Sequence, residues 1–197
     1  TITVQDIEIP TALCQAITID LVAGNASITP ADIDVGSSDN CGINNTSVTP
    51  TAFTCAEVGD NTVTLTVTDD NGNTSDCTTT VTIQDTDLPV ANCQNTTIAL
   101  DPTGNVTLLA SDVDNGSNDN CGIASLDVFP AAFTCSNVGD NTVTLTVTDG
   151  DNNTASCTAI VTVEDNILPS ANCNDLTVAL DNNGLVTITP NDVNNAN

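Results

Sequence analysis

The side chains that could perform chemistry in this chain are carboxylates, hydroxyls and thiols. The 197 residues include 26 Asp and Glu and 9 Cys but no Lys, Arg, His, Trp or Tyr, which gives a formal net charge of −26. A chain without basic side chains cannot neutralise a phosphate backbone, so nucleic-acid binding is excluded. A polybasic membrane patch is excluded for the same reason. Most enzyme classes also lose their usual acids and bases, and we expect no catalysis.

The carboxylates recur in a fixed pattern. The motif Asp-x-Asp-x-Gly-x-x-Asp begins at Asp32 and again at Asp112, and further acids stand at Asp6 and Asp85, just after predicted strands. Ca²⁺ takes about six to eight hard oxygen ligands and tolerates irregular geometry, and loops rich in Asp, Asn and Gly provide such ligands. Alternatively, these residues are common simply because Asp and Asn favour turns on a soluble surface.

The cysteines indicate an oxidising, extracellular setting, because disulfides persist there. A zinc site would need closely spaced cysteine pairs and a catalytic cysteine would need a histidine, and the sequence contains neither. The only aromatic residues are Phe53, Phe129 and Phe133. We therefore expect the thiols to form disulfides that staple small cores poor in aromatic side chains.

An internal repeat organises the chain. Residues 58–69 recur letter for letter at 138–149, which is 80 positions later (138 − 58 = 80), and Cys41, Cys55 and Cys77 recur with the same offset. We expect the chain to be a segment of a longer array. The predicted parts are the last strand of a preceding repeat at 1–6, complete repeats at 7–86 and 87–166, and the start of an incomplete third repeat at 167–197.

Within each repeat, hydrophobicity alternates with the period of two that is typical of β-strands. In residues 62–69, Val63, Leu65 and Val67 share one face and threonines occupy the other. Turns rich in Asp, Asn and Gly separate the strands, and no stretch has a helical period. Several short strands in about 80 residues predict an all-β fold of tandem Ig-like β-sandwich repeats.

These motifs together carry a family resemblance. The succession D-x-x-[IL]-P, DNCGI, VGDNTVTLTVTD, NGN and C-T-x-x-V-T-V resembles the hyalin-type (HYR-like) repeat. It is more closely similar to the tandem repeats of very long secreted Bacteroidota surface proteins, such as gliding-motility adhesins. The resemblance covers essentially the whole chain. It implies an extracellular Ig-like module, strung in tandem, that serves adhesion or forms a stalk without catalysis.

Strand order suggests which cysteines pair. In an Ig-like sandwich the first strand would pair in parallel with the last, and Cys93 stands just before the first strand while Cys157 begins the last. The remaining cysteines would then staple a local loop, although four cysteines allow three connectivities. We predict the disulfides Cys14–Cys77, Cys41–Cys55, Cys93–Cys157 and Cys121–Cys135, and a partner for Cys173 beyond Asn197.

The same topology gathers acids at each junction between repeats. Three elements are expected to reach one end of a sandwich: the loop before the third strand, the turn before the last strand, and the last strand of the preceding repeat. In the second repeat that turn contains Asp149 and Asp151. We predict a Ca²⁺ ion that bridges neighbouring repeats. Its candidate ligands are Asp32, Asp34, Asp39, Asp85, Asp87, Asp112, Asp114 and Asp119.

These observations favour a structural role. We predict a stalk or adhesive repeat of a secreted, cell-surface-attached adhesin or extracellular filament. Its partners would be neighbouring repeats of the same chain and an unknown surface or polysaccharide ligand. An alternative is a self-assembling matrix or filament subunit that acts through lateral contacts between copies.

Three other roles are less favoured. A glycosidase acid pair is a remote alternative, because the clustered acids Asp32, Asp34 and Asp39 recur at the repeat period and no Trp, Tyr, Arg or His is present to hold a sugar. An ice-binding row of threonines is equally remote, because outward Thr is ordinary in strands. Insertion into a membrane is not expected, since no apolar run reaches about 20 residues.

Overall fold

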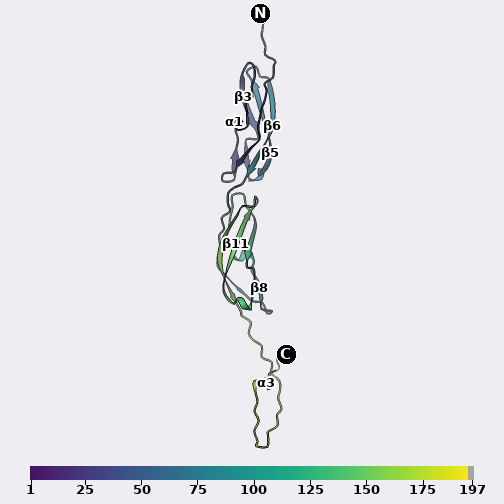
Figure 1. Ribbon diagram of the computed structural model, residues 1–197, viewed down its shortest axis with the longest axis vertical. Helices are drawn as coiled ribbons and strands as arrows, with labels where there is room; N and C mark the ends of the chain where they lie inside the picture. Colours follow the sequence, from purple (N-terminus) through teal and green to yellow (C-terminus); the bar gives the residue numbers. More distant parts are fainter. Residues whose placement is uncertain (195–197) are drawn as a thin grey trace.

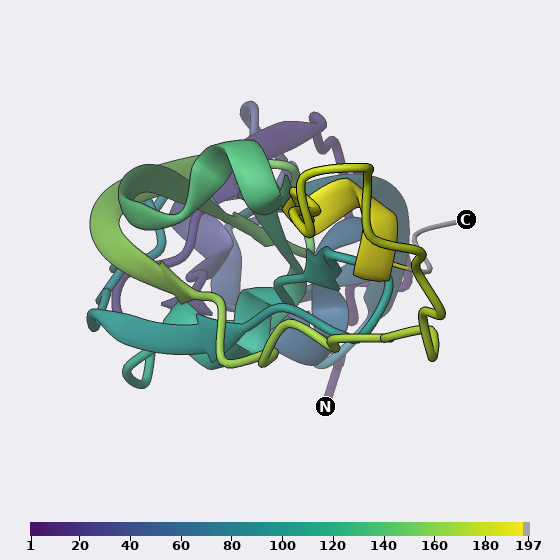
Figure 2. The same ribbon diagram turned by 90° about the horizontal axis from the view of Figure 1, so that it is seen from below.

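The strands of each repeat assemble into a β-sandwich, and the two sandwiches follow one another along a single long axis (Figure 1). The computed structural model describes residues 1–194. Seen along the long axis, the projections of the two repeats overlap (Figure 2). The two repeats therefore form a rod, with the N-terminus at one of its ends.

The two repeats contain the same elements in the same order. The first consists of β1 (Ile17–Asp20), β2 (Asn25–Ser27), α1 (Pro30–Ile33), β3 (Ile43–Thr49), β4 (Ala52–Thr54), the 3-10 helix η1 (Cys55–Glu57), β5 (Gly59–Asp69) and β6 (Thr74–Gln84). The second consists of β7 (Thr96–Ala99), β8 (Asn105–Thr107), α2 (Ala110–Val113), β9 (Ile123–Phe129), β10 (Ala132–Thr134), η2 (Cys135–Asn137), β11 (Gly139–Asp149) and β12 (Thr154–Glu164).

Each repeat combines a four-stranded sheet with a two-stranded one. The larger sheets have the strand orders β1-β6-β5-β3 and β7-β12-β11-β9, and the smaller ones pair β2 with β4 and β8 with β10. The first and last strands are parallel neighbours in both repeats, as predicted. The predicted all-β fold of tandem Ig-like sandwiches is confirmed. The helices α1 and α2 were not predicted, because a single turn is too short to leave a periodic signal.

The core lies between the two sheets of each repeat. Val63, Leu65 and Val67 of β5 are completely buried, and the threonines between them are not, as the alternation predicts. From the smaller sheets, Phe53 and Phe133 enter the two cores. Burying such a side chain contributes roughly 1.5–3 kcal/mol to the free energy of unfolding. The apolar face of β5, and the same face of β11 in the second repeat, therefore stabilises each repeat.

Strand direction gives each repeat two distinct ends, here named the entry end and the exit end. In the first repeat, the entry end consists of loop 39–42 and turn 69–73, and the exit end consists of turn 21–24 and η1. Because β6 runs from the entry end to the exit end, the linker after Gln84 leaves from the exit end. It reaches the entry end of the second repeat, which loop 119–122 and turn 149–153 form (Figure 1).

Two of the expected disulfides are present inside the sandwiches. Cys14 is bonded to Cys77 and Cys93 to Cys157, with Cα–Cα distances of 6.0 and 5.9 Å. Both bonds join the segment before the first strand to the last strand. Each closes a long loop, which in the chain-entropy model stabilises the repeat by about 4 kcal/mol.

The two local disulfides were predicted wrongly. Cys41 and Cys135 are free and exposed, and Cys55 is bonded to Cys121 of the other repeat. The reason is the direction of β3 and β4, which both run from the entry end to the exit end. The seven residues of β3 alone span about 23 Å. A bond between Cys41 and Cys55, or between Cys121 and Cys135, would have to cross the length of the sandwich.

The chain after the second repeat is mostly exposed. It includes the one-turn helix α3 (Pro190–Val193) and an isolated bridge between Cys173 and Asn194. The last three residues of the predicted third repeat, 195–197, lie outside the described residues. In residues 1–194, no helix has the length and apolar character needed to cross a membrane.

Candidate site at the junction between repeats

A disulfide joins the exit end of the first repeat to the entry end of the second. Cys55 lies at the start of η1, and Cys121 lies in the loop before β9; their Cα atoms are 5.2 Å apart, within the usual range for a disulfide. The Cys55 Sγ also lies 3.5 Å from the backbone oxygen of Asn120. The two repeats are thus connected twice, by the linker peptide and by this bond.

Gly24 allows the two loops to approach this closely. It has a φ of +78°, and a Cβ atom at this position would lie 3.2 Å from the Cys55 Sγ and 3.4 Å from the Asn120 oxygen. Glycine adopts positive φ without steric cost, and it leaves room for the sulfur atom. The exit end is therefore shaped to receive the loop that contains Cys121.

Three carboxylates converge beside this disulfide. Asp85 comes from the linker, Asp119 from the loop before β9, and Asp149 from the end of β11, and one oxygen from each lies within 4.8 Å of the others. Asp85 and Asp149 are buried, with exposed fractions of 4% and 1%. One acid thus comes from the linker of the first repeat and two come from the second repeat. We call Asp85, Asp119 and Asp149 the junction triad.

Local hydrogen bonds hold the two acids of the second repeat. The Asp149 carboxylate accepts hydrogen bonds from the backbone N–H groups of Asp151 and Asn153, at 2.9 and 2.8 Å, which closes the turn between β11 and β12. The Oδ1 of Asp119 accepts from the N–H groups of Cys121 and Gly122, at 2.8 and 3.1 Å. The loop that positions Cys121 for the disulfide therefore also positions Asp119.

Asparagines of the second repeat hold the linker acid. Asn120 donates a side-chain hydrogen bond to the Asp85 Oδ1 at 3.2 Å, and Asn153 donates one to the Asp85 backbone oxygen at 2.9 Å. The N–H of Asp87 donates to the same Oδ1, at 3.2 Å. Asp87 is thereby placed next to the triad through its backbone.

Two oxygens of the triad have no partner of their own. The Oδ2 atoms of Asp85 and Asp119 are buried and accept no hydrogen bond. An unpartnered buried carboxylate oxygen is costly, and the cost grows when like charges stand beside it. Burial, followed by the negative charges of Asp85, Asp149 and Asp119, raises the pKa of the neighbouring Asp151.

The donor set of the triad suits a hard cation. All the groups that converge are oxygens, and the chain contains no Lys, Arg or His to neutralise them. Ca²⁺ is bound by carboxylate, amide and backbone oxygens in flexible geometry. The unpartnered Oδ2 atoms of Asp85 and Asp119 are the positions that such an ion would satisfy.

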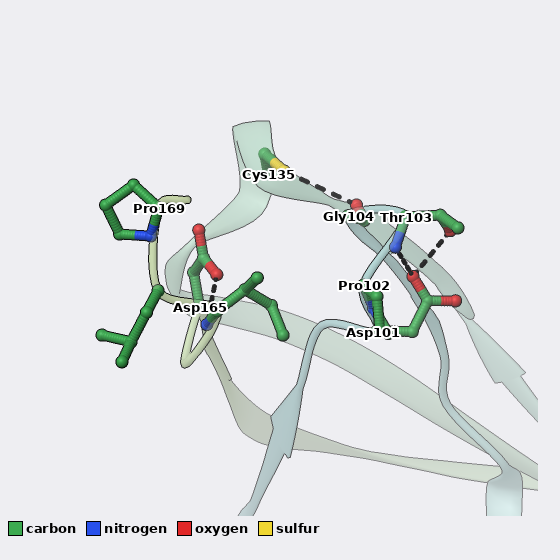
Figure 3. Close-up of a pocket in the computed structure, with 9 residues that line it drawn as sticks. Asp101, Pro102, Thr103, Gly104, Cys135, Asp165 and Pro169 are labelled. Carbon is green, nitrogen blue, oxygen red and sulfur yellow. Dashed lines mark hydrogen bonds between the residues drawn. The ribbon is translucent and has the colours of Figure 1, made fainter. Parts of the chain in front are cut away.

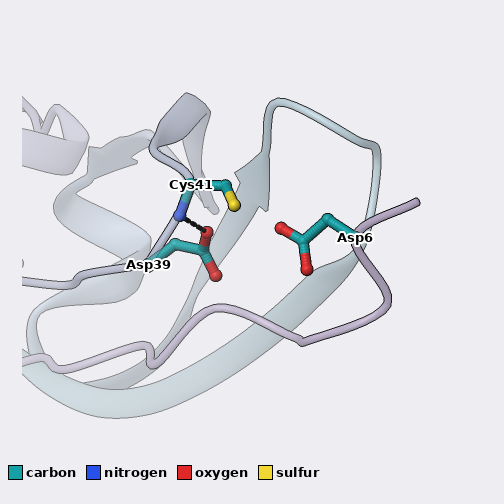
Figure 4. A group of neighbouring side chains, drawn as sticks. All are labelled: Asp6, Asp39 and Cys41. Atoms are coloured by element: carbon teal, nitrogen blue, oxygen red, sulfur yellow. Dashed lines mark hydrogen bonds between the residues drawn. The ribbon is translucent and has the colours of Figure 1, made fainter. Parts of the chain in front are cut away.

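A matching group stands at the entry end of the first repeat. Asp6, Asp39 and Cys41 approach one another there (Figure 4), at positions that correspond to Asp85, Asp119 and Cys121. The Asp39 Oδ1 is buried without a partner, and the Cys41 N–H donates to its Oδ2 at 2.7 Å. A hydrogen bond to Asp6, followed by burial and the nearby charges, raises the pKa of the Cys41 thiol.

Four of the predicted ligands have local roles away from the junction triad. Asp32 and Asp112 accept the N–H groups that open α1 and α2, from Thr29 at 2.6 Å and from Leu109 at 2.9 Å. The N–H of Thr29, followed by its hydroxyl, lowers the pKa of Asp32. Both acids therefore satisfy a backbone N–H group at the start of a helix, as the acidic residue of a capping box does.

Asp34 and Asp114 close the turns that follow these helices. Each accepts from the N–H of a serine three residues later, Ser37 at 2.9 Å and Ser117 at 3.0 Å. Hydrogen bonds from these serines lower the pKa of both acids. Sequence reasoning placed Asp149 at the correct end of the repeat but did not include it among the ligands.

No protein-family model and no curated protein matches the chain. Several solved structures are similar to it in fold. A fragment of protocadherin gamma B7 with extracellular cadherin domains 1–4 matches at 12% identity over 78% of this chain and 51% of that one, with a TM-score of 0.34. The chain thus spans about half the length of that fragment.

Two further solved structures are similar to this chain in fold. EC1-2 of the human mucin-like protocadherin matches at 12% identity over 79% of this chain and 98% of that one, with a TM-score of 0.37. A variant of the titin domains I67–I69 matches at 9% identity over 79% of this chain and 65% of that one, with a TM-score of 0.39. These similarities concern the fold alone.

Proposed function

We propose that the chain is a segment of a secreted, surface-attached rod whose tandem Ig-like repeats serve as a stalk or adhesive arm, and that it is not an enzyme. The observation that carries this proposal is the junction, where a disulfide connects the two sandwiches end to end beside a group of converging acids. A free linker would allow the repeats to bend, whereas a second covalent connection restricts their relative rotation. Disulfides of this kind persist in extracellular settings.

The charge of the chain supports this role. Its 26 acids face no basic side chain, so parallel copies repel one another at low ionic strength. Lateral assembly is therefore disfavoured relative to an extended single chain. The repulsion also acts between the two repeats, and it is strongest where the triad brings their acids together.

Calcium is the second part of the proposal. We infer that Asp85, Asp119 and Asp149 hold a Ca²⁺ ion, with Asp87 beside them, and that this ion converts the repulsion at the junction into a bridge. The two unpartnered buried oxygens support the inference, because nothing else in the described residues satisfies them. Asp32, Asp34, Asp112 and Asp114 are not part of this group. We infer a second ion at the matching Asp6 and Asp39, where Glu8 also contacts the loop through Asn40.

Small-angle scattering of the oxidised chain tests the proposal. We expect profiles of two sandwiches in line in 10 mM Ca²⁺, and a broader distribution of distances between repeats in chelator. Asp112→Asn is the matched control, since Asp112 caps α2 and lies outside the triad. Its profile should still respond to calcium. Profiles of a flexible two-bead chain under oxidising conditions with calcium would contradict the stalk.

A further inference from the structure

Cys135 occupies in the second repeat the position that Cys55 occupies in the first (135 − 55 = 80), yet it is free and exposed. Within their own repeats, the two residues have equivalent neighbours. Each begins a 3-10 helix, and the Sγ atoms lie 3.9 Å from the Gly24 oxygen and 3.7 Å from the Gly104 oxygen. Both glycines have a φ of +78°. The exit end of the second repeat thus reproduces the half-site that binds Cys121 at the junction.

A pocket of about 460 Å³ opens beside Cys135 (Figure 3). Its lining combines turn 101–104, the Cys135 thiol and the linker residues Asp165, Ile167, Leu168 and Pro169. Asp165 corresponds to Asp85 of the triad (165 − 85 = 80), and its Oδ1 accepts from the Ile167 N–H at 3.0 Å, as Asp85 accepts from Asp87. The elements that contact loop 119–122 at the junction are all present here without that loop.

The entry end of the first repeat has the complementary half. Cys41 corresponds to Cys121 (121 − 41 = 80), is likewise free and exposed, and lies in the same Asp-Asn-Cys-Gly sequence. The chain therefore presents one receiving half-site at Cys135 and one inserting loop at Cys41, at opposite ends of the rod. This polarity is that of a head-to-tail series, in which each contact joins two different surfaces.

We propose that the pocket at Cys135 is a docking site for the Asp-Asn-Cys-Gly loop of a repeat that follows in tandem, and that a disulfide between Cys135 and the cysteine of that loop closes it. The Cys41 loop makes the same connection to a preceding repeat. The disulfides then form a series with one bond at each junction. This inference goes beyond the proposed function and does not depend on calcium.

The chemistry of the bond is ordinary thiol–disulfide exchange. The two thiols lose two protons and two electrons as the S–S bond forms, and a low-molecular-weight disulfide such as oxidised glutathione accepts both and becomes two thiols. The reaction proceeds through a mixed disulfide, so an accessible thiol is needed. Cys135 is exposed, and it meets this requirement.

The series would give every junction a second covalent connection. Within a repeat, the path from the incoming to the outgoing bond would run from Cys41 to Cys55 through β3 and β4, a separation of 14 residues (55 − 41 = 14). This path does not include the linker. A rod built in this way would stay covalently continuous after a linker is cut, because the two halves remain joined through the disulfide.

The test uses a longer protein in which residues copied from the second repeat complete the third one. Residues 118–165 are appended after Asn197, since the third repeat keeps the offset of 80 (173 − 93 = 80). The protein is refolded in a glutathione buffer, its free thiols are alkylated, and it is cleaved after Asp and Glu without reduction. We expect a peptide that joins Cys135 to the appended copy of Cys121, because tethering provides an effective concentration of order millimolar.

Two controls distinguish a native bond at Cys135 from a bond formed by misfolding. The Cys55–Cys121 peptide must be present in the same sample, which shows that an equivalent junction has formed. In the variant Cys135→Ser, the appended copy of Cys121 should become alkylated while Cys55–Cys121 remains. Full alkylation of Cys135, or its pairing with Cys173, would overturn the proposal. Disulfide-linked dimers through Cys135 and Cys41 of two molecules would overturn the assignment to a repeat of the same chain.

Discussion

Replacing the linker acid of the triad tests the junction most directly. Asp85→Asn keeps the size of the side chain and the oxygen that accepts from Asn120, but it removes one charge and turns an unpartnered oxygen into a donor. Two opposite effects follow. In chelator the variant should be more stable than the natural chain, because repulsion within the triad falls. In calcium it should lose the stabilisation that the ion provides.

The sizes of both effects can be worked out. Two charges less than 4.8 Å apart repel by about 3.5 kcal/mol at an effective dielectric constant of ~20, so a gain of at least ~1 kcal/mol in chelator is expected. For extracellular modules, calcium dissociation constants are about 0.1–1 mM. At 10 mM Ca²⁺ the natural chain then gains about 1.4–2.7 kcal/mol. For a repeat of about 80 residues this raises the melting temperature by roughly 6–20 °C.

Calorimetry of the oxidised protein in 10 mM Ca²⁺ and in chelator measures both effects. Asp112→Asn is the control: it weakens the cap of α2 and lowers the melting temperature in both buffers, but the calcium-dependent rise should persist. If Asp85→Asn melts at a lower temperature than the natural chain in chelator, the triad is not a site of repulsion. If it retains the full calcium response, the ion is not held there.

Three further outcomes follow from the junction. In chelator, the melting temperature should rise as pH falls from 7 towards 3.8. The pKa of Asp151 is raised above its ordinary value of 3.8, so the folded state binds a proton more readily than the unfolded one. The melting temperature should fall again below about 3.8, where protonation removes the stabilisation from acids of lowered pKa such as Asp34 and Asp114; a monotonic curve would contradict this. Gly24→Ala should slow formation of the Cys55–Cys121 disulfide in glutathione buffer, as measured by alkylation of the free thiols. Gly184→Ala is the control and should leave the rate unchanged, because Gly184 also has a positive φ but no atom lies within 4 Å of an added Cβ. Cutting the linker between the two repeats should leave one species on a non-reducing gel and two after reduction, and Cys55→Ser should give two species without reduction.

The fold was predictable because its signals are local and repeated. The alternation in residues 62–69 identifies the buried face of β5, and the burial of Val63, Leu65 and Val67 follows from it. Parallel pairing of the first and last strands then places Cys14 beside Cys77. These steps need only strand periodicity and one rule of topology.

The junction disulfide could not be predicted from the repeat alone. When the sequence is shifted by 80 residues, a bond within a repeat becomes the equivalent bond within the next repeat, and a bond between two repeats becomes the equivalent bond between the next two. Repetition of the cysteines is therefore compatible with both kinds of bond. The sequence signal that separates them is the strand between Cys41 and Cys55. The hydrophobic alternation of this strand is weak, because the consecutive residues Asn44 and Asn45 are both exposed. The sequence therefore does not reveal the length of the strand, which makes a local bond impossible.

The acids raise a similar ambiguity, since Asp is a residue type that can either close a turn or bind a cation. Thr29 and Asp32 have the spacing of a helix cap, which assigns Asp32 to the backbone rather than to an ion. Asp119 also accepts backbone hydrogen bonds, but its second oxygen is buried and unpartnered. The difference lies in burial beside the incoming segment, which also holds for Asp39 at the entry end of the first repeat. Such burial leaves no mark on the spacing of the acids.

A chain with 26 acids and no basic side chain has few ways to bring two of its repeats into contact. It cannot form ion pairs between side chains across the junction, and screening by salt weakens repulsion without creating attraction. A covalent bond and a shared divalent cation are two solutions that need no basic residue. Both use the same short loop, because Asp119 and Cys121 are two residues apart and Asp119 accepts the N–H of Cys121. Formation of the disulfide therefore fixes one ligand of the triad, so an oxidised junction should bind calcium more tightly than a reduced one.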